Sequence, residues 1–389
     1  MKTIILACLL LSSATLFSQP DNNNNLTGTY TVYENINGNI QPKVITRPEI
    51  NNSGYNEFQN SIPNEDAFTN NTYVRWKFID PVAIGDRNQV SGNGLFAVTG
   101  WGLNTERVSL YNNSGSTPLW EFMTDPNVNI NHVAISDTGG VIAVSSYKNV
   151  YLFNRANSTP FFNFNLLTLP QTLTAGPIDI TNNGGFIVVG LNSGVATDSS
   201  FIMGFSKDSI LPTWRVEVGQ TGAGGSAIQG VRIAGDDSLA IVNTYGGFYV
   251  IRTYTGQVIY QGAINPSSSS GTQAPQGISG NGNVIATINY SGYVRVFQRS
   301  GNTYNLLWQH QEPPGSYYNW MTAVDVSYDG SMVACGTLNF LTSSSYDGKT
   351  KLFRTTNSTP LWTHTGAGDE ISAVSFSKKR AHINFLFMG

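Results

Sequence analysis

The residue types that most often carry out catalysis or bind metals are sparse in this chain and lie far apart. There are four histidines, and no two of them have the close spacing of a metal-ligating pair. His132 begins an expected strand, and His382 lies near the last residue. His310 and His364 each follow a tryptophan by two residues. This shared position in two repeats favours a structural role for both rings over a catalytic one.

Motifs for nucleophiles, phosphates and cations are also missing. The sequence contains neither a Gly-x-Ser-x-Gly elbow nor a phosphate-binding loop. Asp329-Gly330 and Asp347-Gly348 lack the alternating acidic ligands of a calcium loop, so both are expected to be turns. Cys335 lies in the apolar segment Val-Ala-Cys-Gly and is expected to be a small buried hydrophobe. The sequence therefore predicts no catalytic residue, no metal and no cofactor.

Aromatic side chains in expected loops are the better candidates for a functional site. Tryptophan and tyrosine rings stack on sugars and fill the centres of protein interfaces. Most of the candidate aromatic residues lie in two of the longest expected loops, residues 313–320 and 338–348. An alternative is that Trp320 and Phe340 only cap strands. The candidate ligand-binding residues are Trp101, Tyr317, Tyr318, Trp320, Phe340 and Tyr346.

A repeated turn positions these loops. Its pattern is an apolar residue, Ser or Thr, any residue, Asp or Asn, Gly, and then a second apolar segment, and successive copies begin between 45 and 53 residues apart. Asn, Asp and Gly tolerate the positive φ of a tight turn, and the flanking Val, Ile and Ala segments predict strands buried on both faces. The seven copies begin at Ser91, Ser136, Thr181, Ala234, Ser279, Ser327 and Ser377.

A second feature closes each repeat: a strand, a polar turn, and a short strand that carries an aromatic residue. Several of these turns read Ser-Thr-Pro followed by two large apolar residues, which indicates a packing device repeated at the edge of each unit. The aromatic residues are Trp76, Trp120, Phe162, Trp214, Tyr260, Trp308 and Trp362.

Repeats of this length, built from short strands, predict an all-β protein, a seven-bladed β-propeller of four-stranded blades. Trp76 precedes the first turn, and no aromatic strand follows the last one. Residues 73–78 are therefore expected to be the outer strand of a composite last blade whose inner strand is residues 371–377. The turn after that strand reads Lys378-Lys379-Arg380 in place of the repeat pattern. This predicts a last blade that is truncated or shifted in reading frame.

The repeats between residues 73 and 377 resemble those of the WD-repeat and quinoprotein-dehydrogenase-like (PQQ-like) β-propeller superfamilies. The Thr-Pro-Leu-Trp strands at Trp120 and Trp362 are similar to the quinoprotein repeat, whereas the hairpin turns are similar to the WD type. The quinoprotein resemblance would imply a quinone held with calcium and, in many members, a vicinal cysteine pair. This chain has no such pair.

Three regions are expected. Residues 1–18 have the charged start, short apolar run and small residues of a signal peptide; a lipoprotein signal ending at Cys8 is the alternative. Residues 19–72 are expected to be an Asn-rich linker or loosely ordered extension, with a hairpin possible around Asn37-Gly38. Residues 73–389 are the propeller. The protein is therefore expected to be secreted or periplasmic.

The low content of charged residues limits the classes of partner that the protein could bind. Charged residues make up 12% of the chain and the net charge is −3, which argues against binding to nucleic acid phosphates. We therefore expect a secreted, non-enzymatic and monomeric β-propeller that acts as a binding or scaffold module for a protein or glycan partner, without a membrane span. The alternative is a propeller-type enzyme, such as a hydrolase, lyase or quinoprotein-like dehydrogenase. It would need Asp, Glu, His or Arg side chains to converge at the channel mouth.

Overall fold

The structure is a computed structural model, and its strands form a series of separate antiparallel sheets. It describes residues 14–16, 29–36, 39–46, 84–102, 106–124, 128–169, 171–195, 199–220, 227–264, 274–313, 319–342, 345–365, 370–376 and 383–387. Within these residues the regular structure is β-strand, together with the short 3-10 helix η4 (Leu166–Thr168).

Six sheets follow one another along the chain, and each pairs its strands in chain order. Blade 1 is β4 (Ile84–Val90), β5 (Phe96–Gly102), β6 (Arg107–Asn112) and β7 (Trp120–Met123); blade 2 is β8 (Ile130–Ile135), β9 (Val141–Ser146), β10 (Asn149–Asn154) and β11 (Pro160–Asn165); blade 3 is β12 (Leu173–Ile180), β13 (Phe186–Ser193), β14 (Ser199–Ser206) and β15 (Trp214–Gln220). Blade 4 is β16 (Ile228–Ile233), β17 (Leu239–Thr244), β18 (Gly247–Arg252) and β19 (Val258–Ala263); blade 5 is β20 (Gly277–Ile278), β21 (Val284–Ile288), β22 (Tyr293–Ser300) and β23 (Thr303–Gln311); blade 6 is β24 (Asn319–Val326), β25 (Met332–Phe340), β27 (Thr350–Arg354) and β28 (Trp362–His364). Blade 6 also contains β26 (Tyr346–Asp347), which pairs with the end of β25.

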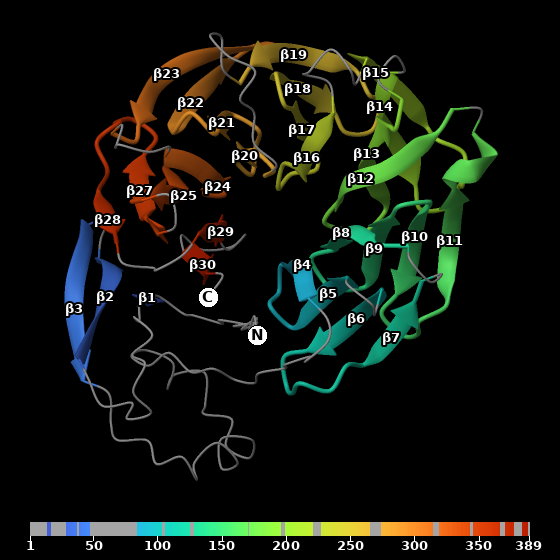
Figure 1. The fold of residues 1–389 in the computed structure, drawn as a ribbon, viewed down its shortest axis with the longest axis horizontal. Helices are drawn as coiled ribbons and strands as arrows, with labels where there is room; N and C mark the ends of the chain where they lie inside the picture. The colour runs from blue at the N-terminus through green and yellow to red at the C-terminus, as the bar shows by residue number, and fades with distance from the viewer. Residues whose placement is uncertain are drawn as a thin grey trace.

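The sheets are arranged around a ring, so the chain is an all-β propeller. Figure 1 shows β4, β8, β12, β16, β20 and β24 nearest the centre and the fourth strand of each blade at the rim. The seventh blade position holds β29 (Ile371–Phe376), which pairs with β30 (Ile383–Phe387). The Thr322 hydroxyl in blade 6 donates to the Ile371 carbonyl at 2.8 Å. Residues 73–78 and the expected turn at Ser377 lie outside the described residues.

Six of the predicted turns are described, and all six adopt one geometry. In each, the backbone N–H of the fourth residue donates to the carbonyl of the first, and the fourth residue has positive φ. That fourth residue is glycine in five turns and Asp237, with φ of 63°, in blade 4. Where the first residue is Ser or Thr, its hydroxyl also accepts a backbone N–H from the returning strand, as Ser136 does from Val141 at 3.0 Å. The turn chemistry read from the sequence is therefore confirmed.

The turns also bind one another across blade boundaries. The Asn93 N–H donates to the Asp137 carbonyl at 2.9 Å, and the Asp137 N–H donates to the Asn182 carbonyl at 2.9 Å. The Asp236 N–H of blade 4 donates to the Gly280 carbonyl of blade 5 at 2.7 Å, and the Gly280 N–H donates to the Tyr328 carbonyl of blade 6 at 2.8 Å. We call this end of the ring the turn face. Consecutive blades are held together there by backbone hydrogen bonds as well as by apolar packing.

Aromatic residues of the rim strands lock each blade to the next. The indole nitrogen of Trp120 donates to the Arg155 carbonyl of blade 2 at 3.0 Å. Trp214 in blade 3 and Trp308 in blade 5 make the same bond to the following blade, at 2.9 Å and 2.7 Å. Blades 2 and 4 use Phe162 and Tyr260 at this position, and these rings contact Phe205 of blade 3 and Tyr304 of blade 5.

The core lies between blades, because each middle strand contributes side chains to both of its faces. In β9, Ile142 and Val144 belong to the cluster shared with blade 1, whereas Ala143 belongs to the cluster shared with blade 3. This explains the near-continuous apolar character of these strands in the sequence. Cys335 is fully buried in the cluster between blades 5 and 6, as its apolar surroundings predict.

The N-terminal region contains a separate three-stranded sheet. The strands β2 (Thr29–Ile36) and β3 (Asn39–Thr46), which precede and follow Asn37-Gly38 in the sequence, pair along their whole length, so the possible hairpin is present. The short strand β1 (Ala14–Leu16), inside the expected signal peptide, pairs with β2. Among the described residues, no helix is long and apolar enough to span a membrane.

Candidate functional site

The end of the ring opposite the turn face gathers the loops that contain the candidate aromatic residues. Strand β24 begins at Asn319 and runs toward the turn at Ser327, and β25 returns to end at Phe340. Trp320 and Phe340 therefore lie at the far end from the turns. We call this end the loop face. It also carries the connection between β21 and β22, which contains Tyr290.

Four aromatic rings form a continuous row on the loop face of blades 5 and 6. The ring centroids of Tyr290 and Trp320 are 4.8 Å apart, those of Trp320 and Phe340 are 5.1 Å apart, and those of Phe340 and Tyr346 are 6.0 Å apart. We call these residues the aromatic row. Tyr346 is 43% exposed and Leu341 beside it is 60% exposed. The row therefore ends in an accessible apolar surface, and rings of this kind suit stacking on a ligand.

The structure brings together three of the six candidates and separates another. Trp320, Phe340 and Tyr346 are in the aromatic row, because β26 folds back on the end of β25 and pairs Phe340 with Tyr346. Tyr290 was missed, since it lies in blade 5 and only the ring places it beside Trp320. The sequence signal for it was the turn Asn289-Tyr290-Ser291-Gly292. Tyr317 and Tyr318 lie outside the described residues.

Trp101 lies on the loop face of blade 1, away from the aromatic row, and its ring is used within its own sheet. It is 6% exposed. Its indole nitrogen donates to the Ser109 hydroxyl at 3.0 Å, and the Arg107 guanidinium lies 4.8 Å from its ring centroid. Trp101 therefore packs as part of blade 1.

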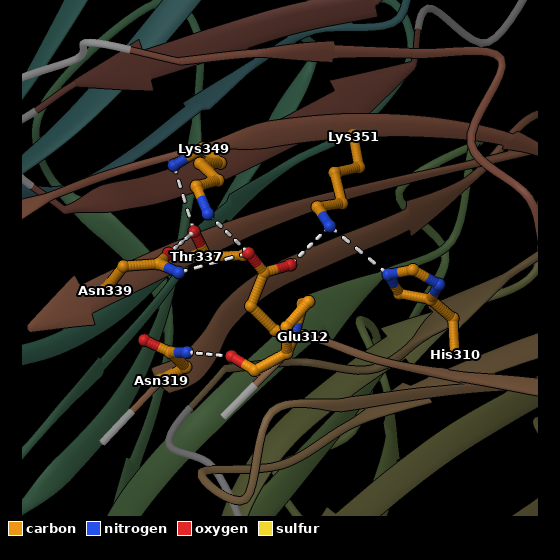
Figure 2. A network of polar contacts seen from close by, with 8 residues as sticks. His310, Glu312, Asn319, Thr337, Asn339, Lys349 and Lys351 are labelled. Atoms are coloured by element: carbon orange, nitrogen blue, oxygen red, sulfur yellow. Dashed lines mark hydrogen bonds and ion pairs between the residues drawn. The ribbon is translucent and has the colours of Figure 1, made fainter. Parts of the chain in front are cut away.

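A largely buried polar network lies beside the aromatic row, where the end of blade 5 meets blade 6. The carboxylate of Glu312, just after β23, is 1% exposed. Its Oε1 accepts hydrogen bonds from the Lys349 ammonium at 2.6 Å and from the Asn339 side-chain amide at 3.1 Å. Its Oε2 forms an ion pair with Lys351. Figure 2 shows Lys349 and Asn339 on one side of this carboxylate and Lys351 with His310 on the other.

Contacts with the lysines lower the pKa of both Glu312 and His310. Burial alone would raise the pKa of Glu312, but hydrogen bonds and charges from Lys349 and Lys351 outweigh it and hold that pKa below its usual value. Burial and the positive charge of Lys351, 3.2 Å from its Nε2, lower the pKa of His310. Burial raises the pKa of the Cys335 thiol to about 12, so this thiol is not a ready nucleophile.

Charged groups also converge at the inner strands, near the centre of the ring, but their carboxylates are already bonded. Asp179 Oδ2 accepts the Ile233 N–H of the next blade at 2.7 Å. Asp325 Oδ2 likewise accepts the Phe376 N–H of the next blade at 2.8 Å, and its Oδ1 forms an ion pair with Arg232 from blade 4. These carboxylates link neighbouring blades by hydrogen bonds. A general acid or base would need a carboxylate oxygen free to meet a substrate.

His132 lies in the same inner region and is held neutral. Burial, followed by the charges of Arg87 and Arg232, lowers its pKa to about 4. Among the described residues, no group of three or more His, Cys, Asp or Glu side chains is placed to hold a metal ion. The inner strands thus offer structural ion pairs, whereas the loop face offers an accessible aromatic surface.

Comparisons with known proteins agree on the fold. No protein-family profile matches the sequence, and no curated protein matches it. The solved β-propeller domain of Cps50 (Swd1) from Myceliophteria thermophila is similar, with a TM-score of 0.57, 12% identity, and coverage of 78% of this chain and 94% of that chain. The Dos1 propeller has a TM-score of 0.59, 14% identity, and coverage of 79% of this chain and 77% of that chain. These similarities establish the propeller shared by both superfamilies that the repeats resemble; the quinoprotein-like assignment stays a prediction.

Proposed function

We propose that this protein is a secreted, non-enzymatic β-propeller whose loop face, at blades 5 and 6, binds a protein or glycan partner. The observation that carries the proposal is the aromatic row. Its four rings come from separate segments of two blades and end at Tyr346, which is 43% exposed. Aromatic residues of this kind are enriched among those that contribute most to binding.

The inner strands support a binding module over the alternative of an enzyme. The carboxylates of Asp179 and Asp325 accept backbone N–H groups of neighbouring blades and so serve the ring itself. The expected signal peptide at residues 1–18 is the reason for proposing secretion. Fractionation of the producing cells, with sequencing of the mature N-terminus, tests this; a chain that keeps Met1 in the cytoplasm would contradict it.

The binding test compares two exposed tyrosines on the loop face. Tyr346 ends the aromatic row, whereas Tyr147, 51% exposed between β9 and β10, lies in blade 2. The wild-type protein is immobilised and probed with a glycan array and with the extracellular fraction of the producing cells. Each retained ligand is then titrated against Tyr346→Ala and Tyr147→Ala. Removing an aromatic residue on which a ligand stacks or packs typically costs about 2 kcal/mol when it is a main contributor to binding, which is roughly a thirtyfold loss of affinity.

We expect Tyr346→Ala to weaken binding by that amount and Tyr147→Ala to leave it unchanged. Both side chains are exposed, so neither substitution should impair folding, and circular dichroism checks this. Equal affinity of the two variants for every ligand would place the binding surface elsewhere on the ring.

A further inference from the structure

Three side chains of the polar network between blades 5 and 6 are arranged as an amine, an amide and a shared carboxylate. Lys349 Nζ lies 2.6 Å from Glu312 Oε1, and Asn339 Nδ2 lies 3.1 Å from the same oxygen. Asn339 is 3% exposed and Glu312 is 2% exposed. Because one oxygen accepts both nitrogens, the lysine amine and the asparagine amide are held together on one side of the carboxylate (Figure 2).

We propose that Lys349 and Asn339 become joined by an isopeptide bond, which forms within the folded chain with Glu312 as the proton carrier. The Lys349 side chain is 29% exposed and that of Glu312 is 1% exposed, and an amine and an amide that bond to the same carboxylate oxygen gain the large advantage of an intramolecular reaction. A general base must lie within about 2.6 to 3.2 Å of the proton it takes, and Glu312 satisfies this for both nitrogens.

The reaction exchanges one amide for another. Glu312 takes a proton from the Lys349 ammonium, and the freed lone pair of Nζ attacks Cγ of Asn339, forming the new C–N bond and a tetrahedral adduct. Glu312 then passes a proton from Nζ to Nδ2. The Cγ–Nδ2 bond breaks with its electron pair on nitrogen, and the amide nitrogen departs as ammonia, which leaves as ammonium with the remaining proton. Nothing is oxidised or reduced, and no co-reactant is required.

Thr337 orients the electrophile. Its hydroxyl donates a hydrogen bond to Asn339 Oδ1, which is the oxygen that gains negative charge when Nζ attacks. The same hydroxyl oxygen accepts the backbone N–H of Lys349 at 2.9 Å. Thr337 therefore contacts both reacting residues and fixes the amide with its oxygen away from Glu312.

The second lysine of the network is placed for a different task. Lys351 forms its ion pair with Oε2, on the side of the carboxylate away from Asn339 (Figure 2). Its ammonium balances the charge of Glu312 before and after the reaction. The geometry thus selects Lys349 as the nucleophile.

The bond would close a covalent ring from residue 339 to residue 349, which contains Phe340 and Tyr346. These two residues form the exposed end of the aromatic row. Closing a loop reduces the conformational freedom of the unfolded chain, so the bond would stabilise the folded form of this loop.

Peptide mapping of the purified wild-type protein tests the proposal. Between Arg299 and Lys349 the sequence contains no lysine or arginine, so trypsin should release residues 300–349 from an unmodified chain. In the modified chain Lys349 is blocked, and we expect a peptide of residues 300–351 that is lighter by one ammonia. Because the cross-link holds both ends of the segment 339–349 together, a single backbone break inside it should release no fragment ion.

Variants separate this reaction from other losses of ammonia. Glu312→Gln keeps the shape of the side chain without its basicity, and Lys349→Arg keeps a cation that cannot form the bond, so both should give full-mass peptides. Lys207→Arg, at a surface ion pair with Asp208, is the matched control and should stay modified. If Glu312→Gln does not fold, Lys349→Arg and the wild-type map still decide. A wild-type peptide that ends at Lys349 would overturn the proposal, whether at full mass or lighter by one ammonia through a succinimide at Asn339.

Discussion

The most strongly perturbed histidine sits at the inner strands, where the blades meet. Burial and the neighbouring charges of Arg87 and Arg232 lower the pKa of His132 from 6.5 to about 4. The unfolded chain therefore binds this proton more tightly than the folded one. The stability that the neutral ring provides is complete above pH 6.5 and is lost as the pH falls from 6.5 toward 4.

This shift predicts an acid-sensitive fold whose sensitivity depends on His132. At 1.36 kcal/mol per pKa unit, the wild type should lose up to about 3 kcal/mol of unfolding free energy from this group between neutral pH and pH 4. Urea denaturation at the two pH values measures the loss. In His132→Gln the loss should shrink by that amount, while His310 and His364 contribute equally to both proteins. Identical pH dependence in wild type and variant would show that His132 is not the sensitive group.

Asp237 is a second residue whose environment departs from the repeat. It holds the positive φ that glycine holds in the other five described turns, and its carboxylate accepts the Asn182 N–H of blade 3 at 2.9 Å. Ala keeps neither the contact nor the tolerance for this backbone, so Asp237→Ala should lower the unfolding free energy by about 2 to 4 kcal/mol. Asp237→Gly should cost less, because it relieves the backbone. Urea denaturation ranks the two, and an alanine variant as stable as the glycine variant would contradict the backbone argument.

Local chemistry explains which residues could be predicted from the sequence. Asp, Asn and Gly in a turn act on their own backbone, so the six described turns were visible as a pattern. The polar network was not, because Glu312 meets Lys349 and Lys351 only after blade 6 folds. Its one local signal was two lysines at alternate positions, Lys349 and Lys351, just before the apolar pair Leu352-Phe353.

At the scale of the element, the rim strands depend on a tryptophan that reaches the next blade. The Trp214 ring fits between two glycines: a Cβ on Gly256, in the next blade, would lie 2.6 Å from the ring, and one on Gly204 would overlap it. Its indole nitrogen donates to the Thr253 carbonyl at 2.9 Å. Sequence alone indicated the aromatic strand and its period, whereas the partner in the next blade required the ring.

Trp214→Phe should therefore lower the unfolding free energy by about 1 to 2 kcal/mol, because the indole hydrogen bond and part of the packed ring are lost. The same substitution at Trp120 and Trp308 should have a similar effect, since each donates to a turn carbonyl of the following blade. Tyr260→Phe, at the equivalent position in blade 4, is the control and should change stability by less than about 0.5 kcal/mol. Chemical denaturation measures all four. A Trp214→Phe variant that unfolds with the wild type would mean that the interblade bond contributes nothing.

At the scale of the whole molecule, the ring joins its blades in sequence through turn contacts, inner carboxylates and rim tryptophans. These three kinds of contact recur because each repeat presents the same positions to its neighbour. The sequence predicted the number and order of blades, since both follow from counting repeats. It did not predict β26, because that strand interrupts the return from β25 to β27 within blade 6 alone.

The last blade offers the sharpest test of the ring as a unit. In the described part of the chain its sheet consists of β29 and β30, whereas the other blades have four strands or more. The sequence predicts that residues 73–78 supply its outer strand, with Trp76 in the role that Trp120 has in blade 1. A strand edge left unpaired would invite association between molecules, so filling it matters for solubility as well as stability.

If residues 73–78 complete that blade, Trp76→Ala should lower the unfolding free energy by about 3 to 5 kcal/mol, as expected for the loss of a packed tryptophan. Tyr55→Ala is the matched control, because Tyr55 lies in the stretch expected to be a linker and should not affect stability. Urea denaturation and sedimentation velocity follow both variants, and the Trp76 variant should also self-associate through the exposed edge. Wild-type stability in both variants would contradict the role of Trp76 in closing the ring.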